Sequence, residues 1–227
     1  CILLQLVATG KPLSTVGMRI EDRTRTFIIA MERTVVPENF SFRMTDEEYR
    51  VLEKIKNSIP VCYLADHADF ALGIVTGNNK KFLSAEKTEH SEMVLKGTDI
   101  CKYHINPVKQ YLRFEPEQFQ QVAPLEIYRA PEKLLYRFIS NQLVVAYDDR
   151  QMLSLNSCNI VIPKIEGMQI KYILAILNSS VSQFVYQKEF HSIKVLRAHM
   201  EHIPIPRVGK AIQNEIIAMT EPLICGM

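Results

Sequence analysis

Side-chain amides, ammonium groups and a flexible backbone come together in one short segment, which reads Thr76, Gly77, Asn78, Asn79, Lys80 and Lys81. Glycine and asparagine tolerate positive φ angles, so the chain can turn sharply here and present free backbone N–H groups beside the two lysines. This is the chemistry of a contact with a polyanion. The alternative is a surface hairpin turn with solvated lysines, and for the segment taken alone we favour that alternative.

Two longer stretches carry more basic than acidic side chains. Between Gly77 and Phe114, seven lysines and arginines, Lys96 among them, oppose four acidic residues. Between Gln183 and Lys210, five oppose two, and Lys194 and Arg197 are among the five. Lysine and arginine neutralise phosphates, while asparagine, glutamine and arginine can read the edges of bases. A solvated surface is the alternative for both stretches.

Motifs for the common catalytic classes are absent from the sequence. There is no Walker A loop, no dinucleotide-binding glycine pattern, no nucleophile elbow, and no acidic residue two positions before a lysine. Asn106-Pro107 lacks the aromatic residue with which base-flipping amino-methyltransferases stack their target. His199 and His202 have the spacing of two metal ligands, but a proline follows and no third ligand is evident, so we favour capping or solvated histidines. Asp148-Asp149 could be paired carboxylates, and a hairpin turn is the favoured interpretation.

The composition is that of a folded domain. The 227 residues are 47% hydrophobic and 23% charged, and a net charge of +2 does not by itself indicate nucleic acid. Five cysteines without a Cys-x-x-Cys pair argue against a zinc site or a disulfide framework and favour the cytoplasm. No apolar run approaches the roughly 18 residues of a membrane span. Cys1 opens directly into an apolar stretch, and we therefore expect a fragment of a longer protein.

The expected elements are short strands in the first two-thirds and helices in the last third. Strands at 2–8 and 26–31 are expected to pair, and Thr45 with Glu48 forms a capping box for a helix at 45–57. Phe70 to Val75 is expected to be a strand, with Phe82 buried after the turn. Further helices are expected near 168–188 and 210–219. The predicted fold is α+β, a twisted, largely antiparallel sheet with flanking helices and a helical C-terminal third.

Six segments together resemble the TaqI-like C-terminal specificity domain, the target recognition domain of adenine-specific DNA methyltransferases and of combined restriction–modification enzymes. The segments are G-I-V-T-G-N-N-K-K-F at 73–82, V-L-K-G-T-D-I-C-K-Y at 94–103, K-L-L-Y-R-F-I-S-N-Q-L-V-V-A-Y-D-D at 133–149, L-N-S-C-N-I-V-I-P at 155–163, Y-I-L-A-I-L-N-S at 172–179 and F-H-S-I-K-V-L-R-A-H-M-E-H-I-P-I-P at 190–206. The end of the chain, with L-N-S, I-P-I-P and an apolar helix, also resembles the specificity subunits of type I restriction systems.

The resemblance implies that residues 61–227 are the target recognition domain, with its C-terminal helix, and that residues 1–60 are the junction and the first strands and helix. The partner would be double-stranded DNA, in a bacterial cytoplasm and without a membrane. An upstream catalytic domain in the same polypeptide would methylate the exocyclic amine of adenine with S-adenosylmethionine, and that parent protein could also cleave DNA. No cofactor is expected on this fragment.

The same resemblance sets the expected contacts with DNA. Phosphates would meet residues 76–81 and Lys96 on one side, and Lys194 and Arg197 on the other. Loops 83–92 and 104–130 would read bases. The expected DNA-binding residues are therefore Thr76, Gly77, Asn78, Asn79, Lys80, Lys81, Lys96, Lys194 and Arg197.

Two other functions stay open at this point. The chain could be a docking module that uses the apolar helix at 210–219, or it could carry its own methyltransferase or nuclease activity, against which the missing motifs speak. Some of the family-like residues also have a structural explanation. The fold itself could require Gly73, Gly97, Asn178 and Pro204, and we expect Leu135, Phe138, Leu177 and Leu196 to pack in the core.

Overall fold

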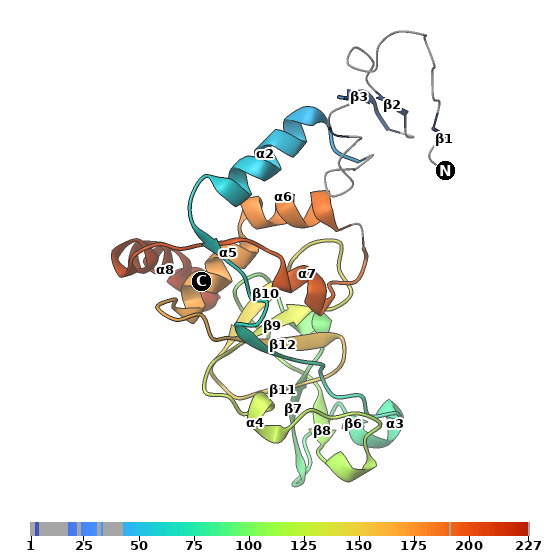
Figure 1. The fold of residues 1–227 in the computed structure, drawn as a ribbon. Helices are drawn as coiled ribbons and strands as arrows, with labels where there is room; N and C mark the ends of the chain where they lie inside the picture. The colour runs from blue at the N-terminus through green and yellow to red at the C-terminus, as the bar shows by residue number, and fades with distance from the viewer. Residues whose placement is uncertain are drawn as a thin grey trace. The chain divides into compact units, whose positions relative to one another are not determined.

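The computed structural model describes residues 3–4, 18–21, 24–30, 33, 43–190 and 192–226 (Figure 1). The chain divides into two compact units, Cys1–Ser58 and Ile59–Met227. The separate roles expected for residues 1–60 and 61–227 stay predictions. Among the described helices, none combines the length and the apolar character that a membrane span requires.

The first unit contains a three-stranded antiparallel sheet in the order β1 (Leu3–Leu4), β2 (Met18–Glu21) and β3 (Thr26–Ile29). The expected direct pairing of the strands at 2–8 and 26–31 is wrong, because β2 lies between β1 and β3. The rest of the strand predicted at 2–8 lies outside the described residues.

Helix α2 (Asp46–Asn57) of the first unit begins at the predicted capping box. The backbone N–H of Glu48 donates to Thr45 Oγ1 at 3.2 Å, and Glu48 Oε2 accepts from the backbone N–H of Thr45 at 3.0 Å. Three acidic residues in the first turn and two lysines in the last turn complement the helix dipole. The predicted helix at 45–57 is confirmed.

The second unit is built on a four-stranded antiparallel sheet in the order β10 (Val145–Asp148), β9 (Lys133–Arg137), β12 (Cys158–Pro163) and β5 (Ala68–Ala71). Strands β9 and β10 are buried along almost their whole length. Strands whose successive side chains are buried need cover on both faces.

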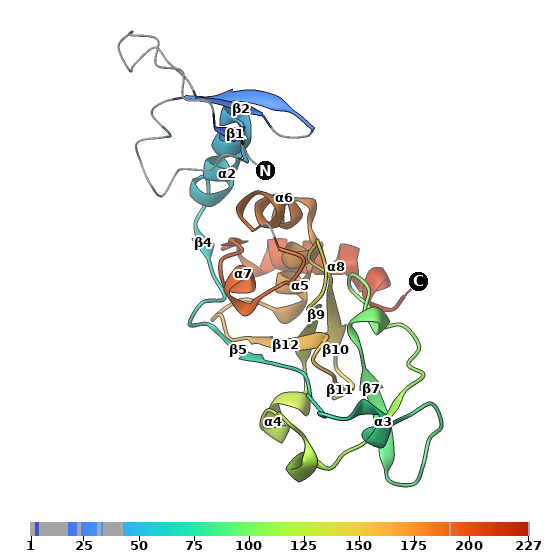
Figure 2. The ribbon, with the colours of Figure 1, turned by 90° about the vertical axis from the view of Figure 1, so that its right-hand side faces the viewer.

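That cover comes from two different layers (Figures 1 and 2). A second sheet, in the order β11 (Leu153–Ser154), β7 (Ser91–Leu95), β8 (Tyr111–Arg113) and β6 (Leu83–Ser84), shares one apolar core with β9, β10 and β12. On the other face, α5 (Ile170–Asn178) packs against β9 and β10 and also contacts α6 (Ser180–Glu189) and α8 (Lys210–Ile224). Helix α7 (Arg197–Glu201) lies in the same layer (Figure 1).

Short elements complete the second unit. Strand β4 (Val61–Cys62) pairs with β13 (Ile205–Pro206), and single turns of helix form α3 (Asn79–Phe82), η3 (Gly97–Asp99), η4 (Pro116–Gln118) and α4 (Leu125–Tyr128). The α+β class with its helical C-terminal third is confirmed. The strands are divided among several sheets, whereas we expected one.

Several residues of the family-like segments serve the fold directly. A Cβ atom on Gly73 would lie 2.2 Å from the carbonyl oxygen of Leu155, and one on Gly97 would lie 2.4 Å from that of Ser157. The buried side chain of Asn178 accepts from the backbone N–H of Val145 at 3.1 Å and donates to the carbonyl oxygen of the same residue at 2.8 Å. These residues hold elements together, so their resemblance to the family does not by itself mark a binding site.

Candidate nucleic-acid interface

The turn at residues 76–81 follows directly from the edge strand β5. Gly77 has a φ angle of 73°, the positive value that its residue type tolerates. Asn78 then caps α3, because its side-chain oxygen accepts from the backbone N–H of Lys81 at 3.2 Å. Phe82 is buried, as predicted. The segment is therefore a capped helical turn and not the hairpin that we favoured.

The turn presents its amides and lysines to solvent. Asn78, Asn79, Lys80 and Lys81 are exposed, whereas Thr76 is only 4% exposed and donates its hydroxyl to Asn79 Oδ1 at 2.6 Å. Thr76 thus positions Asn79, and the four residues after Gly77 supply the groups that a ligand could reach.

Lys81 also lies beside a basic residue that we did not single out. A pocket of about 150 Å³ next to α3 is lined by Lys81, Phe82, Leu83, Ser84, Thr88, Ser91, Tyr111 and Arg113. Two cations and several hydroxyl groups are groups that bind phosphate, and here Arg113 Nε pairs with Glu115 Oε1 at 2.8 Å while Lys81 Nζ donates to Gln118 Oε1 at 2.5 Å. The alternation of Tyr111-Leu112-Arg113-Phe114 in the sequence indicates that Arg113 points away from Leu112, but it does not indicate that Arg113 lies beside Lys81.

Lys96 belongs to a different connection. It precedes η3 and is half-buried, and its backbone N–H donates to Asp99 Oδ2 at 2.7 Å. The next backbone N–H, of Gly97, donates to Ser157 Oγ at 3.0 Å. The backbone N–H groups of Lys96 and Gly97 are therefore hydrogen-bonded within the protein. The charged side chain of Lys96 is the group that a ligand could contact.

Lys194 and Arg197 are exposed and lie over aromatic rings. Lys194 Nζ is 5.8 Å from the ring centre of Phe138, and Arg197 Cζ is 5.1 Å from that of Phe70. Arg197 Nε also lies 2.7 Å from Glu201 Oε1, one turn further along α7. Stacking of this kind holds a cation in place while leaving its outer edge open to a second anion.

Apart from Lys96, the predicted residues form two groups at different places in the second unit, residues 76–81 and the pair Lys194 and Arg197. Figure 2 shows α3 beside the second sheet and α7 among the helices that cover the opposite face of the main sheet. Strand β5 connects the groups, because Phe70 lies under Arg197 and the chain then runs from β5 to Gly77. The sequence did not predict that β5 links these two groups, because they are far apart along the chain.

A slot of about 250 Å³ opens beside the second group. It is lined by Phe70, Ala71, Leu72, Tyr136, Phe138, Asn159, Leu196 and Arg197. Burial raises the pKa of Tyr136 to about 12. Leu135 and Leu177 are core residues as predicted, but Phe138 is half-buried and Leu196 is 42% exposed. The prediction that these two pack in the core is wrong, because they line a surface slot.

The histidine pair has a structural role. His199 Nδ1 accepts from the backbone N–H of Leu196 at 3.2 Å, and the ring stacks on Phe190 with centres 4.5 Å apart. Burial is the main cause that lowers the pKa of His199, which favours the neutral ring. Among the described residues, no group of three His, Cys, Asp or Glu side chains could hold a metal ion. The favoured interpretation as capping is confirmed for His199.

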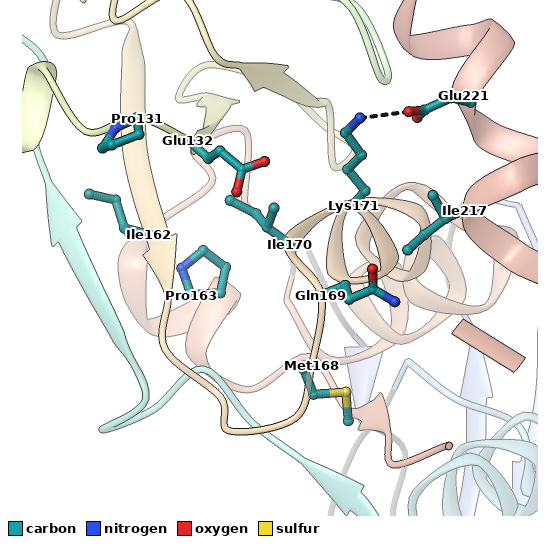
Figure 3. Close-up of a pocket in the computed structure, with 10 residues that line it drawn as sticks. All are labelled: Pro131, Glu132, Ile162, Pro163, Met168, Gln169, Ile170, Lys171, Ile217 and Glu221. Carbon is teal, nitrogen blue, oxygen red and sulfur yellow. Dashed lines mark hydrogen bonds and ion pairs between the residues drawn. The ribbon is translucent and has the colours of Figure 1, made fainter. Parts of the chain in front are cut away.

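A wider groove of about 730 Å³ lies between β12 and the helices α5 and α8 (Figure 3). Lys171 Nζ pairs with Glu221 Oε1 at 2.6 Å, and Glu132 lies across the groove from this pair (Figure 3). Two carboxylates face one ammonium group here, so the groove repels phosphates. We leave it out of the candidate interface.

The second unit thus carries exposed cations on connections beside two sheets that share one apolar core. The model of the TaqI-like C-terminal specificity domain matches residues 92–205, which is half of the chain. The chain belongs to this family, and it is a restriction–modification specificity domain.

Three solved structures are similar to the chain, each at low identity. A chain from a study of the complex assembly and conformational transition of the type I R-M system is 12% identical, with a TM-score of 0.47, over 80% of this chain and 45% of that one. The HsdS subunit from Thermoanaerobacter tengcongensis is 13% identical, with a TM-score of 0.45, over 80% and 44%. The type IIG restriction endonuclease BpuSI is 10% identical, with a TM-score of 0.49, over 87% and 30%.

These similarities are too weak to support an argument about function, so the assignment rests on the family model. The chain spans less than half the length of each of the three solved chains. No curated protein matches it.

Proposed function

We propose that this chain recognises a specific sequence of double-stranded DNA and positions that DNA for the catalytic domain of an adenine methyltransferase. The observation that carries the proposal is the match of the specificity-domain family over residues 92–205. Two groups of exposed cations on the same unit, at 80–81 and at 194 and 197, support it because phosphate contacts fix the register of a protein on a duplex.

Within this proposal the two cation groups contact the DNA backbone. Asn78, Asn79, Lys80 and Lys81 meet phosphates on one side, with the backbone N–H of Gly77 and the charge of Lys96, and Lys194 and Arg197 meet phosphates on the other. Thr76 acts through Asn79. Loops 83–92 and 104–130 read the bases, and Arg113 joins the phosphate contacts through the pocket that it shares with Lys81.

The parent protein supplies the chemistry in this proposal. Its methyltransferase domain lies upstream in the same polypeptide and binds S-adenosylmethionine, and this chain binds no cofactor of its own. A nuclease activity of the parent is compatible with the same division of labour. The missing catalytic motifs of the present chain support this division, and the expected setting is the cytoplasm of a bacterium.

The test starts with selection of duplexes from a random pool by the full chain, followed by a salt titration of binding to the enriched sequence. Replacing Lys80 and Lys81 by alanine should weaken binding to all duplexes similarly and lower the salt slope by about 2, since each lysine that contacts a phosphate contributes about 1. The double variant Lys54→Ala/Lys210→Ala removes two other exposed lysines and should leave the slope unchanged.

Two results would count against the proposal. If no sequence is enriched, even with the catalytic domain present, the chain does not choose a DNA sequence. If a sequence is enriched but the Lys80 and Lys81 variant binds like the unmodified chain, the role of the 76–81 turn is wrong while DNA recognition stands.

Docking on a protein partner is the second candidate function, and one observation favours it. Helix α8 exposes Ile212 by 49%, Met219 by 69% and Leu223 by 42%. Apolar side chains at such spacing on one helix are typical of helix-in-groove contacts. Enrichment of no duplex, together with binding of the catalytic domain that is lost on replacing Met219 by serine, would favour docking over DNA recognition.

A further inference from the structure

Three large apolar side chains are exposed close to Lys194. Ile193 is 71% exposed, Ile139 is 52% exposed and Leu196 is 42% exposed. Single exposed apolar residues are ordinary on protein surfaces. These three, however, lie on two short segments that a β-bridge between Ile139 and Lys194 joins. These three side chains therefore lie at one edge, which we call the apolar–basic edge (residues 138–140 and 192–197).

The backbone of this edge is hydrogen-bonded at Ile193 and directly after it. Its carbonyl oxygen accepts from the backbone N–H of Ser140 at 2.9 Å, and the N–H of Val195 donates to the carbonyl oxygen of Phe138 at 2.7 Å. The N–H of Lys194 donates to Ser192 Oγ at 2.9 Å. The β-branched side chain of isoleucine also has few rotamers. The exposed side chain of Ile193 therefore projects from a backbone that is hydrogen-bonded to residues 138–140.

The charged residues next to this edge indicate what kind of partner it binds. Lys194 follows Ile193 directly, and Arg197 lies over Phe70 at the mouth of the apolar slot. Glu201 is the acidic partner that the structure gives to Arg197. A protein partner with an apolar surface would gain little from two cations beside the contact, whereas the duplex has apolar base faces and T methyl groups between two rows of phosphates.

We propose that Ile193 is an apolar wedge that enters the base stack of the bound duplex while Lys194 and Arg197 hold the phosphates next to it. The proposal rests on the proposed function, because it names what the second cation group does with double-stranded DNA. Opening a base step costs a few kcal/mol, which the additional contacts between the bent DNA and the protein offset. The DNA would be kinked at the step that Ile193 enters.

The experiment uses the full chain and the enriched duplex from the selection, labelled for end-to-end energy transfer and carrying 2-aminopurine at successive positions. The unmodified chain should shorten the end-to-end distance and raise 2-aminopurine fluorescence at one step. Ile193→Ser should abolish both signals and weaken binding on the order of tenfold, with the salt slope unchanged because no charge is lost. Ile193→Met should keep the signals.

A matched control is available on β3. Ile28 is 64% exposed, close to the 71% of Ile193, and Ile28→Ser should leave bending, fluorescence and affinity unchanged. Lys194→Ala should lower the salt slope of binding by about 1 and weaken binding to all duplexes similarly.

The outcomes separate this proposal from the one on which it rests. If the unmodified chain neither bends nor unstacks the enriched duplex, or if Ile193→Ser bends it equally well, the wedge is overturned while sequence-specific recognition stands. If no duplex is enriched, both proposals are overturned. Loss of bending in Ile193→Ser with retained folding, checked by an unchanged melting temperature, supports the wedge.

Discussion

At the scale of single residues, Asp148 and Lys133 form an ion pair that water does not reach. Their side chains are fully buried, with Lys133 Nζ 2.5 Å from Asp148 Oδ2, and the carboxylate also accepts from the backbone N–H groups of Arg150 and Met152 at 2.9 Å each. Burial is the main cause that lowers the pKa of Lys133, and the charge of Asp148 opposes that change. Asp148-Asp149 is therefore not a catalytic pair of carboxylates, since Asp148 is committed to the core.

Removing one member of this pair should be costly. Lys133→Met leaves the Asp148 carboxylate buried without its counter-ion, and we expect the free energy of unfolding to fall by about 3–5 kcal/mol. Urea denaturation monitored by circular dichroism measures the change.

The pair Lys164–Asp69 provides the control for this variant. Its atoms are 2.6 Å apart, but the two side chains are 60% and 40% exposed. Lys164→Met should cost less than about 1 kcal/mol, because solvent screens an exposed pair. Equal losses in the two variants would mean that burial does not set the strength of the Lys133 pair.

At the scale of elements, some connections between strands are packed into the core as closely as the strands themselves. The chain passes from β5 to α3 through Gly73, where a Cβ atom would meet the carbonyl oxygens of Leu155 and Cys158. Ile74 then forms a bridge with Leu155, and its backbone N–H donates to the carbonyl oxygen of Ser154 at 2.7 Å. This close approach sets where the 76–81 turn leaves the core.

Adding one methyl group at this position should therefore disturb the fold. For Gly73→Ala we expect a loss of about 1–3 kcal/mol or more, since backbone atoms cannot move aside as a side chain can. Gly209→Ala serves as the control, because Gly209 has open space within 4 Å of the added atom and a negative φ of −66°. We expect less than about 1 kcal/mol there. Thermal unfolding of both variants in parallel gives the comparison. An unchanged melting temperature for Gly73→Ala would contradict the close approach of Gly73 to the carbonyl oxygens.

Local signals in the sequence identified most of these elements. The capping box at Thr45 correctly predicted the start of α2. Helical spacing of apolar residues, with the interruption at residues 178–180, predicted α5, α6 and the first part of α8. Helical turns of four residues, such as α3, were not predicted, because too few positions carry a period. The division of strands among several sheets was not predicted either, since it depends on pairings such as β12 with β5, which are distant in sequence.

At the scale of the whole molecule, the backbone pairings of each sheet stay within one unit. The three strands of the first sheet lie before Ser58, and the strands of the other sheets lie after Ile59. The second unit therefore contains every strand partner that its described sheets use.

The second unit should fold when produced alone. We expect residues 59–227 to unfold cooperatively, with a melting temperature within about 4 °C of the corresponding transition of the full chain. A loss of about 1 kcal/mol shifts the melting temperature of a unit of this size by only about 2–4 °C. Differential scanning calorimetry of both proteins makes the comparison. A fragment that melts without cooperativity would show that residues 1–58 contribute to the same core.

The candidate interface could be predicted from the sequence only in part. Exposed lysines and amides at 78–81 were found from residue types and turn chemistry, and Lys194 and Arg197 came from the resemblance. Arg113 and the slot beside Arg197 were missed, because both arise where β8 and β5 meet segments distant in sequence. Leu196 was assigned to the core on residue type alone, and its neighbourhood at the start of α7 exposes it.

Strand β5 has consequences for the synthesis of the protein. In its sheet, Ala68–Ala71 pairs only with β12, whose residues Cys158–Pro163 leave the ribosome much later. Pairings between such distant segments form slowly. The nascent chain must therefore carry β5 with an open edge until β12 is available, and an open strand edge invites pairing with other chains. The charged residue Asp69 within β5 discourages such pairing.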